Sequence, residues 1–156
     1  MTEARWLTDQ EQRAWRSLQT MQDDLSEFID RQLRTRSGLS RADYEVLAHL
    51  SETAAGQLRQ FALGRLLRWD KSRLSQHLTR MQSRGLVTRD RSGSDRRGAV
   101  IAITPHGAAL VEAAAPHHVA DVRAALIDQL TAAELRTLTA IGDKVRVRLA
   151  ELESER

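Results

Sequence analysis

Hydrophobic residues recur at helical spacing along most of the chain, and the pattern begins with one long series. A capping box at residues 8–11 opens it, because the Thr8 hydroxyl and the Glu11 carboxylate can satisfy the free amides of a first helical turn. We expect this helix to end near Arg36, before Gly38. Its apolar positions, three or four residues apart, are Trp15, Leu18, Met21, Leu25, Phe28, Ile29 and Leu33.

Shorter series follow. Ser40 can cap a second helix that extends toward Gly56, and residues 57–59 can form a short extended piece. A third helix is predicted around residues 61–67. In the C-terminal third, Thr104 and Pro105 start a fifth helix that contains Pro116, where we expect a kink or a break. A capping box at residues 131–134 opens a sixth helix.

The stretch from Trp69 to Thr104 combines a fourth helix with a hairpin. Asp70 is a good N-cap, Gly85 closes the helix, and Leu74, Leu78 and Met81 form one narrow apolar stripe. Two β-branched segments, 86–91 and 99–103, flank a tip rich in glycine and serine, which predicts a β-hairpin. The predicted fold is mainly α with a small β-wing, a winged helix-turn-helix with six helices.

The composition and the distribution of charge limit the classes of function that the chain can have. The 156 residues suffice for one domain with its own core, and there is no cysteine for a disulfide framework or a thiolate metal site. Neither a signal peptide nor a membrane-spanning apolar run is evident, so we expect a soluble, cytoplasmic protein. The net charge is only +3, but residues 59–98 carry eleven basic and three acidic residues, whereas the remainder of the chain is net acidic. A basic segment on an acidic body indicates a surface that binds a polyanion.

The fourth helix has the side chains that a major groove requires. No acid occurs between Lys71 and Arg89, and the faces around the apolar stripe are rich in hydrogen-bond donors. Short polar groups and arginine near a helix N-terminus can reach base edges, and flanking cations can contact phosphates. We therefore predict base contacts from Ser72, Arg73, Ser75, Gln76 and His77, phosphate contacts from Lys71, Arg80 and Arg84, and wing contacts from Arg89, Arg91, Arg96 and Arg97, with Asp95 orienting an arginine.

These residues make the chain resemble the MarR family of winged-helix transcription regulators. The match lies in residues 72–75 (SRLS), 78–81 (LTRM), 84–87 (RGLV), 95–97 (DRR) and 103–107 (ITPHG), in the family's order and spacing. Residues 92–94 (SGS) depart from the lead-in that often precedes the aspartate of the wing. The order of helices extends the resemblance over nearly the whole chain.

The resemblance implies a homodimer that binds a pseudo-palindromic site on double-stranded DNA, usually as a repressor that a small phenolic or anionic inducer releases. It implies one domain, 1–156, in which residues 1–36 and 105–156 supply the dimerisation helices and residues 40–104 form the winged-helix lobe. The apolar stripes of the terminal helices favour pairing with a second copy, although a self-contained helical bundle is the alternative. The lack of cysteine argues against the thiol-based sensors of the family.

Other functions have weaker support. Trp15 and Tyr44 are the best candidates for an inducer pocket, although aromatic residues at helical spacing are more often core. The five histidines lack metal-binding spacing, so we expect no metal or cofactor, but a zinc regulatory site assembled across the fold stays open. Neither a nucleophile elbow nor a phosphate loop is present, and no enzyme is expected. The main alternative is a dimeric winged-helix module that binds another protein.

Overall fold

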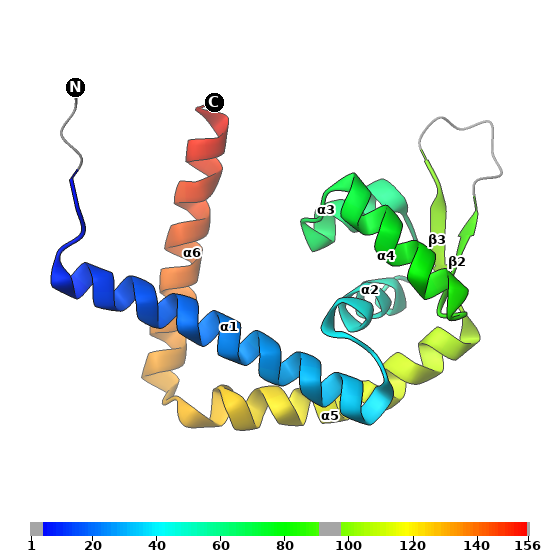
Figure 1. Ribbon diagram of the computed structural model, residues 1–156, viewed down its shortest axis with the longest axis horizontal. Coiled ribbons are helices and arrows are strands. Elements are labelled where there is room, and N and C mark those ends of the chain that lie inside the picture. The colour runs from blue at the N-terminus through cyan, green and yellow to red at the C-terminus, as the bar shows by residue number, and fades with distance from the viewer. Residues whose placement is uncertain (1–4, 91–97, 156) are drawn as a thin grey trace. The chain divides into compact units, whose positions relative to one another are not determined.

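The computed structural model describes residues 5–90 and 98–155, which form two compact units, Met1–His118 and Val119–Arg156. The first unit contains the winged-helix lobe (Figure 1). The described elements confirm the predicted six helices and the small sheet. In chain order they are α1 (Asp9–Ser37), α2 (Arg41–Ser51), β1 (Gln57–Arg59), α3 (Gln60–Leu67), α4 (Lys71–Ser83), β2 (Val87–Asp90), β3 (Val100–Ile103), α5 (Pro105–Ala125), the 3-10 turn Ile127–Gln129 and α6 (Ala132–Ser154).

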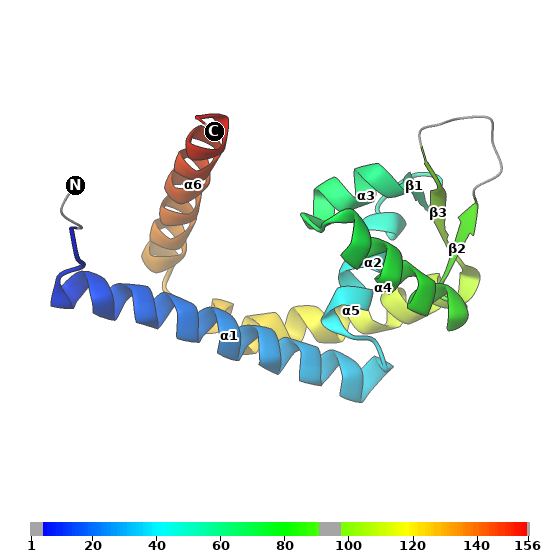
Figure 2. The same ribbon diagram turned by 45° about the horizontal axis from the view of Figure 1, so that its top comes forward.

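Helix α1 begins and ends where its sequence signals indicate. The backbone N–H of Thr8 donates to the Glu11 carboxylate at 2.8 Å, and the N–H of Glu11 donates back to the Thr8 hydroxyl at 3.3 Å. Gly38 ends the helix with φ +70°, a left-handed conformation that glycine adopts without a steric penalty. In both views, α2, α3, α4 and the sheet gather near the C-terminal end of α1 (Figures 1 and 2).

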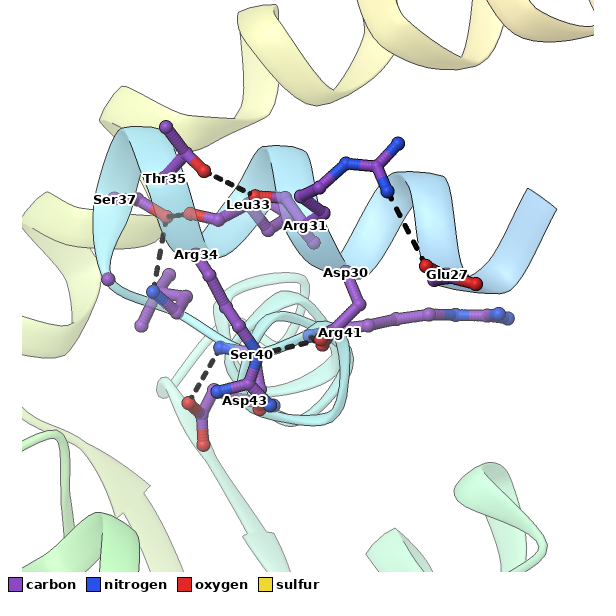
Figure 3. A network of polar contacts seen from close by, with 12 residues as sticks. Glu27, Asp30, Arg31, Leu33, Arg34, Thr35, Ser37, Ser40, Arg41 and Asp43 are labelled. Atoms are coloured by element: carbon purple, nitrogen blue, oxygen red, sulfur yellow. Dashed lines mark hydrogen bonds and ion pairs between the residues drawn. The ribbon is translucent and has the colours of Figure 1, made fainter. Parts of the chain in front are cut away.

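A polar network fixes the junction between α1 and α2 (Figure 3). Asp30 accepts hydrogen bonds from Arg34 Nε at 2.6 Å and from the backbone N–H of Arg41 at 2.8 Å. Ser40 and Asp43 form a second capping box, in which the N–H of Ser40 donates to Asp43 at 2.9 Å. The start of α2 is therefore held both by its own cap and by a carboxylate of α1.

The three strands form an antiparallel sheet in the order β1-β3-β2. Ile101 of the central strand is fully buried and pairs with Leu58 on one side and Arg89 on the other. Helices α2, α3 and α4 contribute the buried side chains that meet this sheet. The fully buried apolar residues of the lobe include Val46, Leu47, Leu50, Leu63, Leu78, Met81, Leu86 and Val87.

Thr104 joins the sheet to α5 and explains the ITPHG motif. Its hydroxyl lies 2.6 Å from the carbonyl oxygen of Gly85 and accepts from the N–H of Gly107 at 3.0 Å, as the N-cap of α5. A Cβ at Gly107 would overlap the carbonyl oxygen of Leu86 and approach Leu47 Cδ2 to 3.1 Å. Only glycine allows the first turn of α5 to pack this closely.

Of the kink or break expected at Pro116, the break is wrong. Helix α5 runs without interruption from Pro105 to Ala125 (Figure 1). An internal proline removes one hydrogen bond to the preceding turn and crowds its carbonyl. Here the turn before Pro116 is anchored by the buried side chains of Val111 and Ala114, which stabilise the helical conformation against that cost. In the second unit, α6 begins at the predicted capping box of Thr131 and Glu134.

Candidate nucleic-acid interface

Helix α4 presents a buried face and an exposed face. Leu74, Leu78 and Met81 are buried, as their spacing predicts, and the Asp70 carboxylate caps the helix by accepting from the N–H of Arg73 at 2.9 Å. Within the helix, five of the predicted DNA contacts are exposed: Lys71, Ser72, Arg73, Gln76 and Arg80; Arg84, just after the helix, is exposed as well. The structure therefore places a donor-rich face without acids on the surface of the lobe.

His77 points from α4 into the lobe. Its Nε2 lies 3.0 Å from Oδ1 of Asp43 in α2, and its side chain is only 12% exposed. On the other side of the ring, Nη2 of Arg80 lies 3.3 Å from Nδ1. The ring of His77 therefore lies between the Asp43 carboxylate and the Arg80 guanidinium. This geometry gives His77 a structural contact in place of a free edge for reading bases.

Arg84, predicted to contact phosphate, also binds Asp43. Its Nη1 lies 2.7 Å from Asp43 Oδ2, and its Nη2 donates to the carbonyl oxygen of Gly38 at 2.9 Å. Burial by itself would raise the pKa of Asp43, but hydrogen bonds from His77, Arg84 and the Ser40 N–H outweigh it and hold the pKa well below its ordinary range. Asp43 is thus a buried anion that joins α2, α4 and the end of α1.

A hydrogen bond links the described part of the hairpin to α4. Arg89 of β2 is half-buried, and its Nη2 donates to the Ser75 hydroxyl at 3.3 Å. Arg59 of β1 donates to the carbonyl oxygen of Gly98 at 3.4 Å, near the start of β3. The predicted wing contacts Arg91, Asp95, Arg96 and Arg97 lie outside the described residues.

Two residues important to this surface were missed from the sequence. Asp43 is not among the predicted site residues, and its partner Arg84 lies 41 positions away. Trp69 appears in the sequence analysis only as the first residue of the stretch that contains the fourth helix, yet the Arg73 guanidinium carbon lies 4.3 Å from the centre of its ring. The spacing of four residues between Trp69 and Arg73 was the available signal for that pair.

The two predicted pocket residues lie in different surroundings. Tyr44 of α2 is half-buried, its ring centroid 4.4 Å from that of His118 in α5. Burial and, to a smaller extent, the charge of Glu52 raise the pKa of its hydroxyl. Trp15 of α1 is 51% exposed and belongs to the apolar stripe of that helix.

Within residues 5–90 and 98–155, no group of three or more His, Asp or Glu side chains is placed to hold a metal ion. No helix in that part of the chain is both long enough and apolar enough to cross a membrane.

Comparisons with known proteins agree with this geometry. The sequence model of the MarR family matches residues 37–98. A comparison with curated proteins gives no match. Among solved structures, AbsC, a MarR family transcriptional regulator from Streptomyces coelicolor, is 38% identical with a TM-score of 0.88, and the match covers 95% of this chain and 99% of AbsC.

Two further structures were solved with DNA. A second MarR family transcriptional regulator from Streptomyces coelicolor, in complex with DNA, is 34% identical with a TM-score of 0.87, covering 94% of this chain and 91% of that one. A mutant MarR from E. coli, complexed with operator DNA, is 27% identical with a TM-score of 0.73, covering 83% and 91%. With identities above 30% over nearly complete chains, this protein belongs to the MarR family of winged-helix transcriptional regulators.

Proposed function

We propose that this protein is a homodimeric repressor that binds double-stranded DNA at a pseudo-palindromic operator and is released by a small molecule. The observation that carries the proposal is the exposed face of α4, which presents Lys71, Arg73, Gln76 and Arg80 with no acid from Lys71 to Arg89. Such a face would bind a polyanion and offers donors to base edges. The DNA complexes of the two relatives support DNA as the partner.

We divide the proposed DNA contacts among the described residues into two groups. Arg73 and Gln76 are proposed to read bases, since arginine can bond guanine and glutamine can bond adenine in a bidentate manner. Ser72 is short and exposed near the same N-terminal turn, and Lys71 and Arg80 suit phosphate contacts. Ser75, His77, Arg84 and Arg89 make contacts inside the lobe and are proposed to hold this surface in place.

Dimerisation is proposed from two apolar stripes. On α1 the stripe is buried at Ile29 and Leu33, but its N-terminal part, Trp15, Leu18 and Met21, is 41–51% exposed. On α6 an exposed stripe at helical spacing consists of Leu138, Ile141, Val145, Leu149 and Leu152. Exposed stripes of this kind mark an interface, and a second copy of the chain would cover them. Residues 1–36 and 105–156 then form the dimerisation region and residues 40–104 the winged-helix lobe.

Release by a ligand is proposed at the border between the lobe and the helices that flank it. Tyr44 supports this because it combines a half-buried ring with a hydroxyl that can bind an anionic or phenolic ligand. Trp15 stays the second candidate, on the exposed stripe of α1. A ligand acts as an inducer if it binds the DNA-free conformation more tightly than the DNA-bound one.

Selection of bound DNA from a random pool tests the proposed function directly. We expect a two-fold symmetric motif with half-sites roughly one or two helical turns apart. If about eight phosphates are contacted per dimer, log K should fall with log salt concentration at a slope of about −7. Failure to enrich any motif would contradict the proposal and would favour a winged-helix module that binds another protein. Transcription in vitro from a promoter carrying the selected site would distinguish repression from activation.

A further inference from the structure

Trp69 lies at the turn between α3 and α4 and contacts two side chains of α4. The Arg73 guanidinium carbon is 4.3 Å from the centre of the Trp69 ring, and the His77 ring meets the indole edge-on with centroids 5.2 Å apart. Arg73 and His77 are four residues apart on one face of α4, and Trp69, in the turn before the helix, contacts both. These contacts link an exposed arginine to the buried anion Asp43 through His77.

The backbone holds Trp69 in place. Arg68 is the one non-glycine residue with positive φ among the described residues, at +55°, and it turns the chain sharply after α3. The N–H of Trp69 then donates to the carbonyl oxygen of Gly64 at 3.0 Å, which closes the end of α3. The next residue, Asp70, caps α4. The indole is thus attached to a turn with little freedom to move.

The stack leaves the hydrogen-bonding edge of Arg73 available. A guanidinium that packs by its face on an aromatic ring keeps its N–H donors in the plane, where they can meet a base edge or a phosphate. Within the described residues, no side-chain hydrogen bond or ion pair of Arg73 competes for these donors. A long, flexible side chain is thereby restricted before it meets its target, which reduces the entropy lost on binding.

We propose that Trp69 is a positioning residue for DNA recognition, and that it acts by holding the Arg73 guanidinium in the orientation that reads the operator. The inference rests on the proposed function. It assigns a role to a residue that lies outside the predicted set of DNA contacts. Asp43 holds the His77 ring in place, and the His77 ring packs against the indole. The indole in turn contacts the exposed face of α4.

A measurement without DNA tests the stack itself. In a Trp6→Phe/Trp15→Phe background, Trp69 is the single tryptophan, so its fluorescence reports the surroundings of that indole. Arg73→Ala should change the emission of Trp69, whereas Arg65→Ala should not, since Arg65 lies over the ring of Phe61. An emission spectrum unaltered by Arg73→Ala would overturn the inference whether or not the protein binds DNA.

Binding to the selected operator tests the role. Trp69→Leu keeps a smaller apolar side chain but removes the aromatic face, and Trp69→Phe restores a face. We expect Trp69→Leu to weaken operator binding about three- to tenfold and to relax the same base position as Arg73→Ala. Trp69→Phe should stay within about twofold of the wild type. In the Arg73→Ala background, Trp69→Leu should have little further effect, because the two residues act as a unit.

A matched pair on α3 controls for the loss of an aromatic ring. Phe61 and Arg65 have the same spacing of four, with the Arg65 guanidinium carbon 5.8 Å from the ring centre, and Phe61 is 70% exposed. Phe61→Leu should leave operator binding unchanged, and equal weakening by both leucine variants would contradict a specific role for Trp69. Equal losses for Trp69→Leu and Trp69→Phe would also contradict it. If the wild-type chain selects no operator, the proposed function is overturned. The fluorescence measurement then shows by itself whether Arg73 stacks on Trp69.

Discussion

At the scale of single residues, the Asp43 carboxylate joins three segments of the lobe. Asp43→Asn removes the charge that faces Arg84 and weakens the contact with His77 while nearly preserving the shape of the side chain. We expect it to lower the free energy of unfolding by about 2–4 kcal/mol at pH 7, as for other broken buried pairs. Urea unfolding measures the loss, and Asp24→Asn, at an exposed position of α1, should change little.

The pH dependence of this loss follows from the direction of the pKa shift. The pKa of Asp43 is lower in the folded chain than its ordinary value of 3.8, so the unfolded chain binds this proton first as the pH falls. The stabilisation is therefore complete at neutral pH and is lost progressively below about pH 4. The difference between wild type and Asp43→Asn should shrink over that range. A difference independent of pH would show that the charge of Asp43 is not the cause.

Gly107 is a second position at which a single added atom, a Cβ, would change the free energy of unfolding. A Cβ would overlap the carbonyl oxygen of Leu86, a backbone atom that cannot rotate away. We expect Gly107→Ala to destabilise the chain by about 1–3 kcal/mol, measured by thermal or urea unfolding. Gly142→Ala is the control, because a Cβ there would meet nothing within 4 Å in the interior of α6. That change should be neutral or stabilise the helix by up to about 1 kcal/mol.

At the scale of elements, α4 divides its polar residues between two tasks. Gln76 is exposed, whereas Arg84, just after the helix, binds Asp43 and the Gly38 carbonyl. Gln76→Ala should weaken operator binding with little change in stability. Arg84→Ala should lower the free energy of unfolding by about 1–3 kcal/mol, because it leaves a buried carboxylate without its cation. Unfolding and operator binding should be measured on both variants. If Arg84→Ala weakened operator binding without lowering the free energy of unfolding, this division of tasks would be wrong.

The sequence predicted the elements well because their signals are local. The caps at Thr8, Ser40, Asp70 and Thr131 all act within three residues, and each helix begins where its cap indicates. Contacts between elements were not predictable in this way. The apolar stripe of α4 shows which face is buried, but it does not show that a polar flank at His77 reaches across to an anion on α2. The break expected at Pro116 was wrong for a related reason, since local propensity carries no information on the packing that stabilises α5.

At the scale of the whole molecule, the apolar stripe of α6 predicts how the chain assembles. Val145 and Val147 are both exposed, at 51% and 62%, but they point roughly 200° apart around the helix. Val145 lies in the stripe with Leu138, Ile141, Leu149 and Leu152, and Val147 lies outside it. If a second copy covers the stripe, a charge at position 145 would be buried without a partner, whereas the same charge at position 147 would stay in water.

Val145→Asp should therefore shift the chain toward monomer at micromolar concentration in sedimentation, and Val147→Asp should sediment as the wild type does. Because each monomer carries one α4, the monomer would contact only half of a two-fold operator. It should lose about half of the salt-dependent slope together with most of the affinity, since binding through two linked sites exceeds the affinity of either alone. A wild-type chain that sediments as a folded monomer would contradict the dimer. Equal effects of the two aspartates would show that the stripe is not the interface.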